Sequence, residues 1–477
     1  MAIALVVLPL LFALAAVATP SEVWRPRLVP VAAALHFGLT VAAVQGPGPT
    51  ALDGWLAIYE LSRVVLPLLS LFFFVFSWYV PTYLALRPRN PNRVFCVSLL
   101  AFLSMMMLIA ESHDLGLMWV ALEANTLASA PLIYFNNNPR SLEATWKYIL
   151  IGGVGIALAL LGSFFLAYSA LHAGLETSLL FDDLVRQAPL LSKPWLHSAF
   201  VLLFVGYGTK LGLAPMHTWK PDAYGEAPGL VGALLAGGLT TCAFLALMRF
   251  FQICSAAGEA AFASDLLVTM GLVSIAVAGV FMARQRDFKR MLAYSSVEHV
   301  GILVLGIGIG GAATFGALLH VINNALTKGV LFLSAANIHR AYGSRTTDRV
   351  SGALRRVPVS GALFLAGFFA VTGSPPFGPF LSEFTILRAT VAAGRYGVAA
   401  LLLVLLFVVF VGMGSTVLAV VQGEPRSDLP DTGFRDSLGT VLPIVTLLAL
   451  VLLLGVYVPP ALDRSLQEAA RFVEARP

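Results

Sequence analysis

Fourteen long apolar stretches, separated by short polar gaps, follow one another along this chain of 477 residues. Each holds about 17–25 residues, the length that an α-helix needs to cross the hydrocarbon core of a bilayer. The mean hydropathy of +0.85 and the charged fraction of 12% agree, because soluble domains carry about 25% charged residues. Backbone polar groups in lipid must be satisfied within the chain, so we expect an all-α polytopic membrane protein. The predicted segments cover residues 2–19, 28–45, 63–84, 94–111, 115–135, 144–170, 198–216, 228–253, 264–283, 291–310, 312–338, 357–386, 397–421 and 437–457.

Basic residues alternate between the gaps. They gather in the gaps after odd-numbered segments, and few lie in the others, with Arg186, Lys193 and Arg395 as exceptions. Positive charge favours the cytoplasmic side, which predicts both termini outside, in a bacterial or archaeal inner membrane. The gaps are short, so residues 1–477 are expected to form a single membrane domain. The basic residues that mark the cytoplasmic gaps are Arg25, Arg27, Arg87, Arg89, Arg93, Arg140, Lys220, Arg284, Arg286, Lys289, Arg290, Arg340, Arg345, Arg349, Arg355, Arg356, Arg426 and Arg435.

Two segments contain interruptions that a regular helix does not tolerate. The seventh includes GYGTKLGLAP at 206–215 and the twelfth includes TGSPPFGP at 372–379. Glycine loosens the helical hydrogen-bond ladder and proline removes a donor from it. Because the breaks lie five segments apart, we expect two five-helix repeats of opposite orientation, over about 94–253 and 264–421. Paired broken helices in an inverted repeat point to a transport site.

Ionisable side chains occur inside these apolar segments, where charge is costly and marks ion or proton pathways. Only six of the 30 basic residues are lysine, and Lys147, Lys210 and Lys328 lie within apolar segments. A buried lysine can give up its proton, whereas arginine keeps its charge almost everywhere. The pattern indicates a protein that moves protons or other ions. The candidate proton-transfer residues are Glu123, Lys147, Lys210, Glu298, His299, His320, Lys328 and Glu383.

Helical spacing groups some of these residues. Glu143 and Lys147 are four apart and share a helix face, and His320, Asn324 and Lys328 repeat the same interval. Structural roles are the alternative at each position. The lysines could form ion pairs that fix helix packing, His320 could be a satisfied core histidine, and Lys147 lies close enough to a segment end to reach the interface.

The composition argues against several other classes. The three cysteines, Cys96, Cys242 and Cys254, form no CxxC pair, so no iron–sulfur or zinc site and no cofactor is expected in this chain. The basic residues are spread over short loops rather than gathered on one stripe, so nucleic acid is not an expected partner. Any redox centre would belong to a partner protein, and whether the chain is part of an enzyme depends on that partner.

Four motifs carry a resemblance to a known family: LGLAPMHTWKPDA, KRMLAYSSVEHVG, HVINNALTKGVLFL and GSPPFGPFLSEF, in this order. Together they resemble the proton-translocating antiporter-like membrane subunits of respiratory complex I, Mrp-type cation/proton antiporters and membrane-bound hydrogenases. LMWVALEANTLASAPLIYF, SLEATWKYIL and AYSSVEHVG are most similar to component F of hydrogenase-4 and related formate-hydrogenlyase membrane subunits. The resemblance implies a fourteen-helix core with helices seven and twelve broken and with key groups at Glu123, Lys210, Lys328 and Glu383.

The chain departs from the family pattern at two places. Many relatives have a histidine or lysine in the eighth helix, where this chain has GALLAGGLTTCAF at 232–244. Water, Thr240 or Thr241 would have to bridge that position. A second histidine that commonly precedes the eleventh-helix lysine is replaced here by Asn324, which does not titrate.

The resemblance implies a proton-translocating, or sodium-translocating, membrane subunit of a hydrogenase-4- or formate-hydrogenlyase-like complex. Such a subunit couples a partner's redox reaction to ion movement. Its partners would be other membrane subunits and soluble redox subunits that carry the metal centres. Two alternatives stay open: a subunit of a multisubunit cation/proton antiporter, and the membrane subunit of an inorganic-carbon uptake complex with a zinc-bearing partner. A purely structural anchor would leave the buried lysines unexplained.

Overall fold

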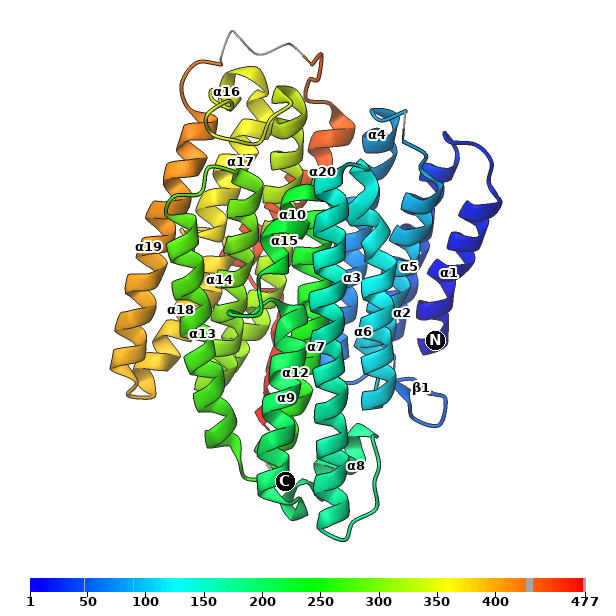
Figure 1. Ribbon diagram of the computed structural model, residues 1–477, viewed down its shortest axis with the longest axis vertical. Coiled ribbons are helices and arrows are strands. Elements are labelled where there is room, and N and C mark those ends of the chain that lie inside the picture. The colour runs from blue at the N-terminus through cyan, green and yellow to red at the C-terminus, as the bar shows by residue number, and fades with distance from the viewer. Residues whose placement is uncertain (47, 89, 426–431, 475–477) are drawn as a thin grey trace.

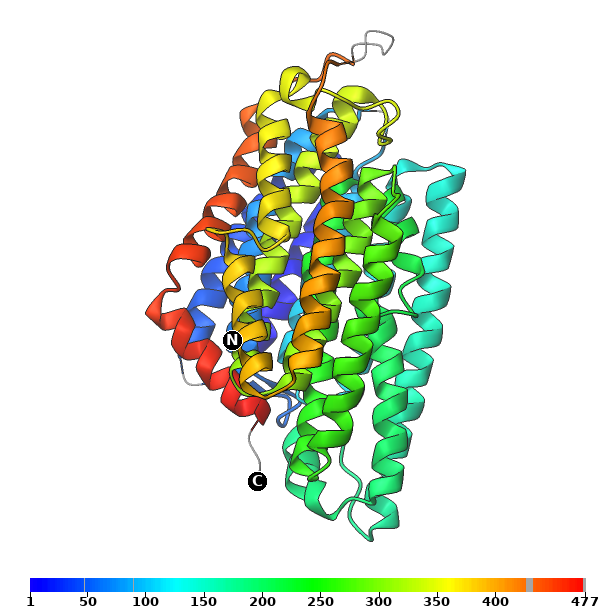
Figure 2. The same cartoon turned by 90° about the vertical axis from the view of Figure 1, so that its left-hand side faces the viewer.

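The computed structural model describes residues 1–46, 48–88, 90–425 and 432–474, so Arg89 and Arg426 lie outside the described residues. Long helices run side by side in one bundle (Figure 1), and the same packing is seen from the side (Figure 2). The short α16 and the loops beside it lie at one end of the bundle, and α8 lies at the other (Figure 1). Among the described residues the only sheet is a two-stranded antiparallel hairpin in which Thr50 pairs with Ala57.

Each of the fourteen predicted segments overlaps one helix or a run of adjoining helices. Within the described residues, eleven helices are long and apolar enough to cross a membrane. The remaining predicted segments correspond to α1, α9 and the pair α17–α18. The elements are α1 (Ala2–Ala18), α2 (Arg25–Gln45), β1 (Thr50–Ala51), β2 (Leu56–Ala57), α3 (Glu60–Ser77), α4 (Tyr79–Ala85), α5 (Arg93–Glu111), α6 (Leu115–Ile133), η1 (Tyr134–Asn136), α7 (Pro139–His172), α8 (Phe181–Gln187), η2 (Ala188–Leu190), α9 (Lys193–Leu211), α10 (Trp219–Glu226), α11 (Gly229–Leu234), η3 (Leu235–Leu239), α12 (Thr240–Ala256), α13 (Ala260–Met282), α14 (Phe288–Ile309), α15 (Ala312–Tyr342), α16 (Ala353–Arg356), α17 (Pro358–Val371), α18 (Gly378–Ala392), α19 (Tyr396–Val421), α20 (Leu438–Val456) and α21 (Pro460–Glu474).

Both predicted helix breaks are confirmed. Helix α9 ends at Leu211, and Gly212 follows in the left-handed conformation with φ of 78°, after which α10 starts at Trp219. In the twelfth segment α17 ends at Val371, and Gly373 has a φ of 65°. The paired breaks are where the inverted-repeat prediction places them, although the repeat itself stays a prediction.

Small residues bring α7 and α9 into close contact. A Cβ atom added to Gly155 would lie 2.7 Å from Cβ of Thr209, and one added to Gly206 would lie 2.6 Å from the backbone nitrogen of Ala159. Glycine at such positions lets two membrane helices approach at backbone distance. The close packing sets the broken end of α9, with Lys210, directly against α7.

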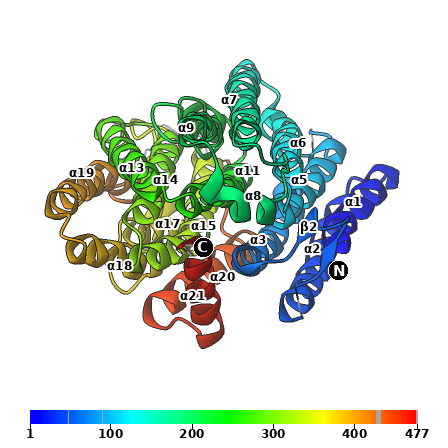
Figure 3. The same ribbon diagram turned by 90° about the horizontal axis from the view of Figure 1, so that it is seen from below.

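The centre of the bundle holds the helices that carry most of the candidate residues. The most apolar windows of α15 and of the α11–α12 run are entirely buried, and α15 lies in the middle of the end-on view (Figure 3). Of the most apolar windows of α7, α19 and α20, only 39%, 33% and 33% are buried, as expected for helices on the lipid-facing side of the bundle. The C-terminal amphipathic helix α21 packs against the bundle through Leu466, Ala469 and Val473. Polar side chains inside α15 are therefore shielded from both lipid and water.

Candidate functional site

The first cluster joins two predicted residues at the break of α9. Nζ of Lys210 lies 3.2 Å from Oε2 of Glu123 on α6 and also donates to the hydroxyl of Thr126. The lysine side chain is 1% exposed and the glutamate 27%. A Cβ atom added to Gly152 on α7 would lie 2.8 Å from Nζ of Lys210, so glycine leaves the room that the ammonium occupies. The pair links the fifth and seventh predicted segments.

Lys147 lies in a separate, more exposed cluster. Its Nζ is 2.6 Å from Oε1 of Glu143 and 2.8 Å from Oδ2 of Asp222, and its side chain is 43% exposed. Asp222, on α10, also forms an ion pair with Arg290. These four residues line a cavity of about 160 Å³. The structure confirms that Glu143 and Lys147 share a face, but Lys147 does not join Lys210, and the sequence did not reveal Asp222 as its partner.

The second cluster surrounds Lys328 on α15. Its Nζ donates to Oγ of Ser295 at 2.6 Å, and Ser295 donates to Oε2 of Glu298 at 3.4 Å. Lys328 and Glu298 are both buried. Because Ser295 and Glu298 both lie on α14, this hydrogen-bonded row connects α15 to α14, and the serine hydroxyl can accept and donate in the same chain.

Two buried histidines extend the cluster toward the second helix break. Nδ1 of His299 and Nε2 of His320 are 2.9 Å apart, and Nδ1 of His320 is 2.9 Å from Oγ of Ser382 on α18. Glu383 follows Ser382 and is half-buried, and its Oε1 has no hydrogen-bond partner among the described residues. An added Cβ at Gly373 would lie 2.2 Å from Oε2 of this glutamate, so the carboxylate packs over the glycine of the break. The structure brings these four groups from α14, α15 and α18 together.

His299, His320 and Glu383 are also the residue types that hold transition metals. Their ligand atoms lie within 4.8 Å of one another. However, both ring nitrogens of His320 are already used, one toward His299 and one toward Ser382. A metal would have to break one of these hydrogen bonds to gain His320 as a ligand. The arrangement suits a hydrogen-bonded chain better than a metal centre.

The eighth predicted segment provides little to connect the two clusters. Thr240 donates to the carbonyl of Leu235 at 3.2 Å, and Thr241 donates to that of Gly237 at 2.6 Å. Both hydroxyls therefore donate within their own helix, which leaves only their acceptor capacity for another group. Residues Leu235–Leu239 form a π-helical turn, a feature frequent at functional sites. The expected bridge through these threonines has no direct contact that supports it among the described residues.

Lys220 is not a loop residue, and the assignment of this lysine to a cytoplasmic gap is wrong. It lies on α10, inside the bundle, and is fully buried. The run APMHTWKPDA contains several polar residues and two prolines, which is the usual pattern of a loop, but its second half starts the short helix α10. The signal that could have revealed this position is the preceding break, since irregular backbone at membrane depth must be covered by protein or line a cavity.

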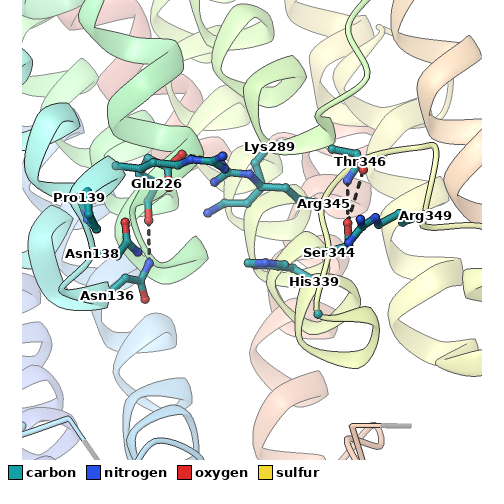
Figure 4. Close-up of a pocket in the computed structure, with 12 residues that line it drawn as sticks. Asn136, Asn138, Pro139, Glu226, Lys289, His339, Ser344, Arg345, Thr346 and Arg349 are labelled. Carbon is teal, nitrogen blue, oxygen red and sulfur yellow. Dashed lines mark hydrogen bonds and ion pairs between the residues drawn. The ribbon is translucent and has the colours of Figure 1, made fainter. Parts of the chain in front are cut away.

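A wide cavity opens at the end of the bundle that carries α16. It has a volume of about 940 Å³ and is lined by Glu226, Lys289 and Arg345 among others (Figure 4). Nζ of Lys289 donates to the carbonyls of Gly225 at 2.8 Å and Ala227 at 2.6 Å, so it holds the end of α10. Burial alone would lower the pKa of Arg345, but hydrogen bonding to Glu226 and the charges of Asp287 and Glu226 raise that pKa above its ordinary value. Ion pairs from Arg345 to Glu226 and Asp287 therefore hold the wall of the cavity in place.

At the opposite end of the bundle, Arg249 is buried among aromatic rings. Its guanidinium lies 3.3 Å from the ring centroid of Tyr59 and 4.0 Å from that of Phe181. Burial, followed by the nearby Arg249 charge, lowers the pKa of His113, which lies 3.0 Å from Asp182. Cation–π packing of this kind fixes helix positions. Hydropathy alone did not single out Arg249.

Comparisons with known proteins agree with this architecture. The family model described as NADH:quinone oxidoreductase/Mrp antiporter, TM, matches residues 112–414. A hydrogenase-4 component F homolog of Methylacidiphilum infernorum is 38% identical over 73% of this chain and 73% of its own length. An NADH-quinone oxidoreductase subunit N of Desulforudis audaxviator is 32% identical over 75% of this chain and 70% of its own. The expected similarity to hydrogenase-4 component F is confirmed.

A solved structure shows the same fold across the whole chain. A chain in the structure of the Mrp complex from Dietzia sp. DQ12-45-1b superimposes with a TM-score of 0.88 at 18% identity, covering 99% of this chain and 97% of that one. The family model spans both helix breaks and all the predicted proton-transfer residues. The chain belongs to the NADH:quinone oxidoreductase/Mrp antiporter family of membrane proteins.

Proposed function

We propose that this chain translocates protons as the antiporter-like membrane subunit of a redox complex of the hydrogenase-4 type. One observation carries the proposal: a buried lysine, Lys210, paired with the partly exposed Glu123 at the broken end of a membrane helix. Such a pair has no stabilising advantage over apolar packing, because desolvation offsets the attraction. Its position at a helix break suits transport better than packing.

The geometry suggests how the pair would work. The Lys210 ammonium is held by one partly exposed carboxylate and one hydroxyl in surroundings of low polarity. If Glu123 moves away, the charge that stabilises the protonated lysine is lost and Lys210 releases its proton. When Glu123 returns, the lysine takes up a proton again. The Lys328–Ser295–Glu298 row offers the same kind of contact in the other half of the chain.

The driving reaction would take place on partners. The relatives include a hydrogenase-4 component and a subunit of a quinone oxidoreductase, both parts of redox complexes by name. We therefore infer that this chain assembles with other membrane subunits, and through them with soluble subunits that carry nickel–iron and iron–sulfur centres. The setting would be the inner membrane of a prokaryote, with both termini outside.

A cation/proton antiporter is the second candidate, favoured by the fold shared with the Mrp complex. Sodium in place of the proton belongs to the same candidate. The inorganic-carbon alternative stays a prediction, for which a zinc-bearing partner would be the sign.

Affinity purification in mild detergent, followed by mass spectrometry of the partners, separates these candidates. We expect hydrogenase-type redox subunits, and the reconstituted complex should acidify vesicles when its redox substrate is added. Antiporter subunits alone would favour the second candidate. A complete redox complex that turns over without moving protons would refute the proposal.

A further inference from the structure

The two buried clusters need a group between them if they act in one pathway. The eighth predicted segment, which holds Thr240 and Thr241 on α12, contains no histidine, lysine, arginine or carboxylate side chain between residues 232 and 244. Lys220 is a buried amine on α10, and a role for it in the pathway rests on the proposed function.

Lys220 is unusual among the buried lysines because its ammonium is not compensated. Lys210 has a carboxylate and Lys328 has a serine hydroxyl, but Nζ of Lys220 has no hydrogen-bond partner among the described residues. It lies 6.0 Å from the ring centroid of Trp219 and 5.8 Å from that of Tyr224. A structural lysine at this depth would be expected to have an acidic partner, because an unpaired buried charge is strongly destabilising.

The fold makes a specific place for this side chain. A Cβ atom added to Gly212 would lie 2.2 Å from Cε and 2.8 Å from Nζ of Lys220. The lysine therefore runs over the glycine that ends α9. The C-terminal end of a helix carries partial negative charge, so this is where a protonated amine gains some stabilisation without a carboxylate.

Contacts extend from Lys220 toward both clusters. On one side the Lys210 ammonium lies 5.9 Å from the ring of Tyr148, whose ring is 5.1 Å from that of Trp219. On the other side the ring of Tyr224 packs 5.7 Å from that of Phe332, one turn after Lys328 on α15. Lys328 is near enough for its positive charge to disfavour a second charge on the buried Lys220. Two ammonium groups in a medium of low polarity repel each other, so protonation of one favours release from the other.

We propose that Lys220 is the proton-binding site that joins the two halves of the pathway. A proton leaves the ammonium of Lys210 and passes, through water admitted at the helix break, to the neutral amine of Lys220. The charge moves from one lysine to the other and the total is unchanged. Release toward the Lys328 cluster then follows when Lys328 is neutral.

The test is redox-driven acidification of vesicles by the purified complex, with four variants of this chain. Lys220→Met removes the amine, and Lys220→Arg keeps a charge that does not give up its proton. Lys210→Met reports on the first half of the pathway. Lys193→Met is the matched control, because it removes a surface lysine that pairs with Glu259.

We expect the wild type and Lys193→Met to translocate alike, while Lys210→Met and both Lys220 variants lose translocation by about a hundredfold. If Lys220→Met does not assemble, the arginine variant decides, because it preserves charge and length. Translocation by Lys220→Arg at the wild-type rate, with Lys210→Met inactive, would overturn this inference alone. A wild-type complex that moves no protons would overturn the proposed function and this inference with it.

Discussion

Lysine and arginine are used differently inside this membrane protein. Arg249 is held between aromatic rings, where its permanent charge can serve packing. Three buried lysines differ in the groups that meet their ammonium: a carboxylate and a hydroxyl at Lys210, a hydroxyl at Lys328, and no hydrogen-bond partner at Lys220 among the described residues. Only an amine can become neutral under these conditions, so the choice of residue matches the proposed chemistry.

Lys328→Arg tests this distinction. Arginine keeps the positive charge but does not release a proton, so translocation should fall by on the order of a hundredfold, nearly as far as in Lys328→Ala. Vesicle acidification by assembled complexes measures both variants. Normal translocation by the arginine variant, with the alanine variant inactive, would make Lys328 an electrostatic fixture instead of a relay.

The broken helices place these residues. If α9 continued past Leu211, Lys220 would lie well beyond Lys210 along the helix axis. The turn at Gly212 instead folds the chain back, and the Lys220 side chain lies over the end of α9. The broken twelfth segment does the same for Glu383, which packs over Gly373. Each break thus brings an ionisable group onto the end of a half-helix.

Gly212→Ala should therefore be more damaging than its backbone strain alone predicts. Gly258 has the same φ of 78° and nothing within 4 Å of an added Cβ, so Gly258→Ala is a matched control. Both variants carry the left-handed strain of about 1–2 kcal/mol. Gly212→Ala must in addition displace Lys220. We expect both to assemble with lowered thermal stability, and only Gly212→Ala to lose translocation. Equal translocation in the two variants would show that the position of Lys220 is unimportant.

Lys193 and His197 on α9 pair with Glu259, the residue that precedes α13. Hydrogen bonds from Lys193 at 2.7 Å and His197 at 2.8 Å lower the pKa of Glu259. A lowered carboxyl pKa stabilises the folded state above the unfolded-state pKa, and this stability disappears as the pH falls through the folded-state value. Glu259→Gln should lower the melting temperature at pH 7, and the difference from wild type should vanish well below pH ~4.3, the ordinary value for glutamate. If the difference in melting temperature persisted in acid, the effect of Glu259→Gln would come from lost packing and not from the ion pairs.

For the whole molecule, the fold was predictable because the bilayer fixes the length and hydropathy of each spanning helix. The Glu123–Lys210 pair was also within reach, since a costly carboxylate and a costly amine on neighbouring segments are expected to meet. The bond between His299 and His320 was not, because it depends on how α14 and α15 are rotated against each other. Lys220 was misplaced because positive charge near a short polar run normally indicates a loop.

The alternation of basic residues between the gaps predicts how the chain is oriented in the membrane. The loop after α13 should face the cytoplasm, with both termini outside. Arg286 is suitable for labelling because its side chain is 75% exposed. Arg286→Cys, in a chain shown to function without its native cysteines, should react with a membrane-impermeant thiol reagent only after the cytoplasmic side is opened. Labelling by the impermeant reagent from the outside alone would show that this loop faces outward and would contradict the predicted topology.

In the proposed function, the Lys210–Glu123 pair at the first helix break takes up and releases the protons that cross the chain. Glu123→Gln tests it most directly, because glutamine preserves the shape of the side chain and removes its charge from Lys210. The measurement is vesicle acidification by the purified, fully assembled complex, with redox turnover recorded in the same sample. We expect acidification to be lost while the complex stays assembled. Wild-type acidification by the assembled Glu123→Gln complex would contradict it.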